Sequence, residues 1–99
     1  MVKGKKGILR VAKIYGERFN VIIDLDFALS ELHDEVGVYA HAVLIHRKKT
    51  KPEKYEPENE MKEMLGEELA DIIGMVVVNA DYFGIDLKKA IQRKWIGRV

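Results

Sequence analysis

The 99-residue chain has balanced charge and no cysteine: it contains 17 basic and 16 acidic side chains, for a formal net charge of +1. A chain of this length supports one domain with a modest core. Balanced charge provides no general attraction to nucleic acid or an anionic membrane, and the lack of cysteine excludes disulfides, thiolate catalysis and zinc–thiolate sites. We therefore expect one domain over residues 1–99, with no nucleic-acid or membrane partner, in the reducing cytoplasm.

The N-terminal third predicts a basic segment followed by one helix. Residues 1–6 carry three lysines, and no hydrophobic stretch typical of a secretory signal follows them. We expect this segment to be flexible. From Ile8 to Phe19 the hydrophobic side chains recur at spacings of three and four, which predicts an amphipathic helix over about 7–19. The β-branched residues 21–23 then form a short connector.

Two long helices follow, separated by an exposed loop. Hydrophobic residues spaced by three and four predict a helix from about residue 26 to residue 48. Residues 49–57 lack periodicity and contain both prolines of the chain, which is typical of a loop. The next helix is expected over about 57–83, with Pro57 in its first turn.

The C-terminal part predicts a short fourth helix. Gly84 is expected to end the third helix, and Asp86 is expected to cap the fourth, which extends to about Trp95. No apolar run approaches the roughly 20 residues that span a bilayer.

These elements predict an all-α fold: a compact helical bundle with two long central antiparallel helices and a short C-terminal helix. Residues 72–78 are apolar almost all round, so this stretch requires cover on more than one side. A single small bundle provides such cover poorly. We expect a homo-oligomer to complete the core.

Acidic residues interrupt the apolar faces of both long helices. Glu68 and Asp71 fall on the apolar face of the third helix, and Glu35 lies beside the apolar seam of the second. Antiparallel packing would bring Glu35 opposite the other two, and such a set of oxygen ligands suits Mg²⁺ or Mn²⁺. The alternative is that these carboxylates are simply solvated, as in most glutamate-rich helices.

Two segments resemble the acidic motifs of MazG-like all-α nucleoside triphosphate pyrophosphohydrolases. Residues 34–43, Asp-Glu-Val-Gly-Val-Tyr-Ala-His-Ala-Val, resemble the first motif of that family, usually Glu-Glu-x-x-Glu. Residues 67–73, Glu-Glu-Leu-Ala-Asp-Ile-Ile, contain the Glu-x-x-Asp of the second motif. Gly-Ile-Asp at 84–86, before a lysine-rich last helix, is also similar. The resemblance covers roughly residues 28–95.

This resemblance implies a dimeric or tetrameric enzyme that uses carboxylate-held Mg²⁺ to cleave a nucleoside triphosphate into a monophosphate and pyrophosphate. It gives metal-ligand and catalytic roles to Glu35, Glu68 and Asp71. The related phosphoribosyl-ATP pyrophosphohydrolases are a further possibility.

The first motif departs from the family pattern at one position. Val38 stands where the third glutamate of the motif is expected, and valine cannot coordinate a metal. Asp34 matches the first acid of the motif, and Glu31 lies one turn before Glu35. Either carboxylate is a candidate to replace the missing ligand. Two other readings stay open: a degenerate relative that binds nucleotide or metal without turnover, and a structural helical interaction module.

The substrate-binding candidates lie near the C-terminus. Lys94 and Arg98 are cations suited to phosphate. Asn79 and Tyr82 have side chains suited to recognising a base, although Asn79 would serve equally in a polar contact between helices.

Overall fold

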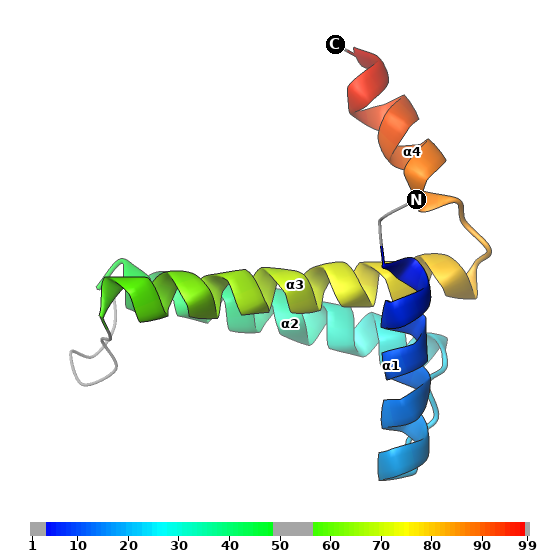
Figure 1. Ribbon diagram of the computed structural model, residues 1–99, viewed down its shortest axis with the longest axis horizontal. Helices are drawn as coiled ribbons and strands as arrows, with labels where there is room; N and C mark the ends of the chain where they lie inside the picture. The colour runs from blue at the N-terminus through cyan, green and yellow to red at the C-terminus, as the bar shows by residue number, and fades with distance from the viewer. Residues whose placement is uncertain (1–3, 49–56, 99) are drawn as a thin grey trace.

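The computed structural model describes residues 4–48 and 57–98, which form four α-helices and one short 3₁₀ turn (Figure 1). The elements are α1 (Lys5–Phe19), α2 (Leu25–His46), α3 (Glu58–Tyr82), α4 (Leu87–Lys94) and η2 (Ile96–Arg98). The described residues contain no strand, which confirms the all-α class. None of their helices combines the length and hydrophobicity needed to cross a membrane. The loop expected over 49–57 lies outside the described residues, apart from its last position.

Local signals in the sequence fix the helix ends. The Asp24 carboxylate accepts a hydrogen bond from the Phe27 N–H at 2.9 Å and caps α2. Asp86 caps α4 in the same way through the Lys89 N–H at 3.1 Å. Gly84 adopts a φ of 64° just after α3, a conformation that glycine adopts without strain. Helix α1 begins at Lys5, so the last two residues of the expected flexible segment are helical.

The two long helices form the predicted antiparallel pair, and α1 crosses it (Figure 1). At the end of the pair away from α1, His46 Nε2 lies 3.6 Å from Glu58 Oε1. This contact joins the end of α2 to the start of α3. Helix α1 packs on the C-terminal half of α3. The buried hydrophobic residues are few and mostly small: Ala28, Ala42, Met61, Val77, Val78 and Ala80.

The single chain is less compact than the sequence predicts. Its radius of gyration is 15.8 Å, against about 13 Å for a compact domain of 100 residues. It exposes 7822 Å², whereas a compact monomer of 11.4 kDa exposes about 5,800 Å². The reason is visible in Figure 1: α1 crosses the long pair on one side, and α4 extends away from it. The all-α helical bundle is therefore confirmed with two helices packed closely, whereas one chain by itself does not reach the compactness expected of it.

Candidate metal centre

The three carboxylates singled out by the motifs meet between the long helices. Glu35, Glu68 and Asp71 each offer one carboxylate oxygen, and these oxygens lie within 4.8 Å of one another. Glu68 and Asp71 are one helical turn apart on α3, so their side chains share one face. Glu35 approaches from α2 because the two helices run antiparallel. The packing thus brings together residues separated by more than thirty positions.

The cluster lies at the edge of the helix interface. Glu35 and Glu68 are half-buried, whereas Asp71 is exposed. Solvent therefore reaches the carboxylates from one side, while the other side faces the packed helices. This position leaves room for a ligand and still holds two of the three side chains in place.

Burial and neighbouring charges raise the pKa of Glu35 above its ordinary value of 4.5. Partial burial is the largest cause, followed by the negative charges of Asp71, Glu68, Glu31 and Asp34. Each of these effects disfavours the ionised carboxylate. A cation at the cluster would relieve this repulsion, so the electrostatics favour binding of positive charge.

A groove of about 810 Å³ runs from this cluster between α1 and the long pair. Its lining includes Glu31, Glu35 and Asp71 along one side, and Val11 and Tyr15 of α1 along the other. The sequence pattern did not place α1 at the site. Gly74 of α3 lines the groove, and a Cβ atom there would lie 4.0 Å from Ile8 Cγ2 of α1, which is an ordinary contact.

The two candidate replacement acids lie in different places. Glu31 lines the same groove as Glu35 and Asp71. Asp34 instead lines a separate shallow recess together with Val38. Glu31 is therefore the better placed of the two to supply a fourth carboxylate.

The donor set fits a hard divalent cation. The side chains that converge are carboxylates, and the cluster found in the described residues includes no histidine. Mg²⁺ and Mn²⁺ prefer oxygen ligands and commonly keep several water molecules, which an open cluster permits. Glu35, Glu68 and Asp71 would hold such an ion, with Glu31 nearby.

The substrate-binding candidates are scattered rather than gathered at the cluster. The Asn79 amide nitrogen donates to the Ala28 carbonyl oxygen at 3.0 Å and to the Met75 carbonyl oxygen at 2.7 Å. It therefore ties α3 to α2, the interhelical role left open by the sequence. Lys94 is exposed at the end of α4. Arg98 is the last residue of η2, and its side chain lies outside the described part of the structure.

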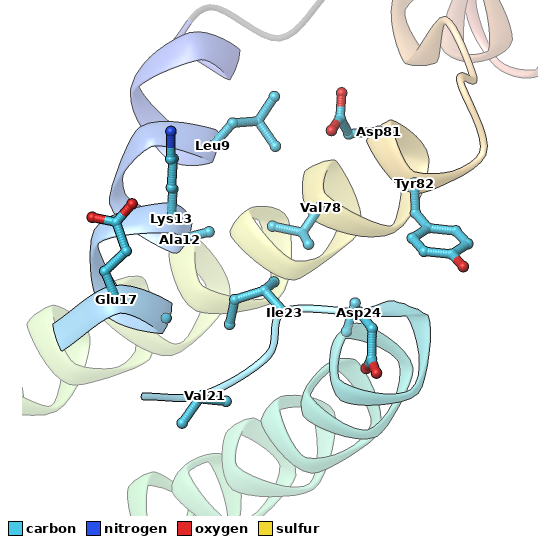
Figure 2. A pocket seen from close by; sticks show the side chains of 12 residues that line it. Leu9, Ala12, Lys13, Glu17, Val21, Ile23, Asp24, Val78, Asp81 and Tyr82 are labelled. Atoms are coloured by element: carbon cyan, nitrogen blue, oxygen red, sulfur yellow. The ribbon is translucent and has the colours of Figure 1, made fainter. Parts of the chain in front are cut away.

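Tyr82 lines a second cavity, of about 430 Å³, on the other side of α1 (Figure 2). Apolar side chains line this cavity together with the charged Lys13, Asp24 and Asp81. Gly16 helps to shape it, because a Cβ atom there would lie only 2.8 Å from the Val21 carbonyl oxygen. Glu35, Glu68 and Asp71 do not line this cavity, so Tyr82 lies at a different opening.

Comparison with protein-family models, curated proteins and solved structures gives no match to this chain. The two acidic motifs and the geometry of the cluster are therefore the features that indicate the site.

Proposed function

We propose that the protein is a Mg²⁺-dependent nucleoside triphosphate pyrophosphohydrolase of the MazG-like kind. One observation carries this proposal: the carboxylates of two motifs far apart in the sequence, at positions 35, 68 and 71, offer oxygens within 4.8 Å of one another. A fold that served only to pack helices has no need to bring like charges together at its interface. A site for a cation and a phosphate-bearing substrate accounts for both the repulsion and the open groove.

Each part of the site has a separate task in this reaction. Glu35, Glu68 and Asp71 would hold the cation, and the chemistry that it would supply when bound is neutralisation of phosphate charge and activation of water. Glu68 and Asp71 share one face of α3, and the half-buried Glu68 is the more constrained of the two. The apolar wall formed by Val11 and Tyr15 is suited to contact the less polar part of a nucleotide. Products are the nucleoside monophosphate and pyrophosphate.

Exposed apolar stripes on the long pair support a homo-oligomer, either a dimer or a tetramer. Counted at about 100° per residue, Leu29 and Val36 on α2 and Leu69 on α3 face away from the acidic groove. Their side chains are 45–58% exposed. The chain exposes about 2,000 Å² more than a compact monomer of its mass, whereas a standard interface removes about 800 Å² per partner. Pairing of two copies through this side would cover both stripes.

The direct test is a screen of canonical and modified nucleoside triphosphates, with release of pyrophosphate measured in Mg²⁺ and in chelator. We expect Mg²⁺-dependent release with a matching amount of monophosphate. Failure to release pyrophosphate from any triphosphate would contradict the proposal.

Val38 favours one second candidate, a relative that binds nucleotide or metal without turnover. This side chain is 47% exposed and offers no ligand at the position where the family has a glutamate. Such a protein would be stabilised against heat by nucleotide with Mg²⁺ but would release no product. The same screen, read by thermal unfolding, separates the two candidates.

A further inference from the structure

Helix α4 extends from the molecule without a packing surface in the described part of its own chain. Among the described elements, α4 packs extensively against η2 alone. It projects away from the pair formed by α2 and α3 (Figure 1). It has eight residues, and isolated helices shorter than about 12 residues are marginal in water. The Asp86 cap stabilises its first turn only. A surface beyond the described residues of this chain would stabilise α4.

The side chains of α4 indicate what kind of surface this is. Leu87 and Ile91 lie on one side, and the exposed Trp95 follows one turn later; Trp95 is 71% exposed. Lys94 lies seven residues after Leu87, so it falls within this apolar stripe rather than opposite it. The helix contains four cations and no acidic residue. Its complement is an apolar surface that carries negative charge.

The groove beside α1 has both properties. Its apolar wall includes Val11, which is 66% exposed, and Tyr15, which is 45% exposed. Its other side carries Glu31, Glu35 and Asp71. The α4 of the same chain points away from this groove, so a helix from another copy has to supply the match.

We propose that α4 of one copy docks along the acidic groove of a second copy, so that each site combines the carboxylates of one chain with Lys94 of another. The apolar stripe covers part of the α1 wall, and the Lys94 ammonium group faces the phosphates held at the cluster. The role of Lys94 rests on the proposed function, whereas the docking of α4 does not. The site of one chain is incomplete without its neighbour.

Trp95 is the single tryptophan of the chain, so its fluorescence reports the docking directly. We expect the emission of the associated protein to lie at shorter wavelength than that of a solvated indole, and to move to longer wavelength on dilution. Val11→Glu, in the groove wall, should produce the same red shift. Ile14→Glu is the matched control, because Ile14 is a 47% exposed residue of α1 that does not line the groove. Solvated emission at every concentration, or an equal response of both variants, would overturn the docking.

Mixing two inactive variants tests whether the sites are shared. Glu68→Gln disables the carboxylate cluster, and Lys94→Ala disables α4. If each site draws on two chains, reassembly of an equal mixture restores roughly a quarter of the wild-type pyrophosphate release, because about one site in four receives both intact parts. No recovery, or full activity of Lys94→Ala alone, would overturn the sharing. If the wild type itself releases no pyrophosphate, the proposed function fails, and the fluorescence experiment alone decides the docking.

Discussion

The α2/α3 pair and α4 are held in opposite ways. The long pair packs along its length, buries residues from both helices and places three carboxylates around one point. Helix α4 has a side-chain cap and an apolar stripe, but among the described elements it packs extensively against η2 alone. Local signals are thus equally clear in both regions, whereas tertiary packing is present in only one.

This difference separates what one chain can do alone from what requires a second copy. Positioning of the three carboxylates depends on contacts within the pair, so the cluster should exist in a monomer. The proposed neutralisation of phosphate by α4 would depend on association. Substitutions in the two regions should therefore affect metal binding, association and turnover in different combinations.

The largest effect is expected from loss of a carboxylate in the pair. Glu68→Gln or Asp71→Asn should lower Mg²⁺-dependent pyrophosphate release by about 100-fold or more, because a ligand is removed while the shape is kept. Thermal unfolding should show no loss of stability. Glu67→Gln is the matched control, since Glu67 is the exposed neighbour of Glu68 and is not part of the cluster. Equal activity of the Glu68 and Glu67 variants would place the site elsewhere.

Association through the exposed apolar stripes of the pair should be disrupted by a carboxylate placed there. Leu69→Glu places one at a 45% exposed position that a second copy would cover. We expect light scattering at micromolar concentration to give a smaller assembly than the wild type forms, while circular dichroism keeps its helical signal. Leu69→Met should retain the oligomer. A folded wild type that is monomeric under the same conditions would refute the oligomer.

A smaller effect is expected at the position where the first motif departs from the family. Glu31→Gln should weaken Mn²⁺ binding by about tenfold, because Glu31 lines the groove with Glu35. Val38→Glu added to this variant should restore the affinity, since it returns a carboxylate one turn from Glu35 on the other side. Calorimetric titration measures both steps. Full affinity of Glu31→Gln would remove Glu31 from the ligand set.

The smallest effect concerns pH. Burial and neighbouring acids raise the pKa of Glu35 in the folded protein, so its ionisation destabilises the metal-free fold as pH rises above the ordinary value of 4.5. In chelator at pH 7, Glu35→Gln should be more stable than wild type by roughly 0.5 kcal/mol, a small value because solvent screens a half-exposed group. The difference should close below pH 4.5. Denaturant unfolding at both pH values checks this, and a gap that widens in acid would contradict it.

Short-range signals predicted most of the helices, and the motif spacing predicted which carboxylates would meet. Capping residues such as Asp86 act on their own helix, so they can be read locally. The relation between Glu35 and the α3 acids followed from antiparallel packing alone. The groove wall could not be predicted, because the crossing of α1 depends on packing between distant residues. For the same reason, only the structure shows that α4 projects from the pair. Only the structure shows, too, that the Asn79 amide donates between α3 and α2.

The central claim is that the cluster binds a divalent cation, and titration of the apo protein with Mn²⁺, followed by the electron paramagnetic resonance signal of the free ion, tests it most directly. The account predicts saturable binding that Mg²⁺ competes away, that Glu67→Gln retains, and that the double variant Glu68→Gln, Asp71→Asn loses. Saturable binding unchanged in the double variant, or no saturable binding in the wild type, would contradict it.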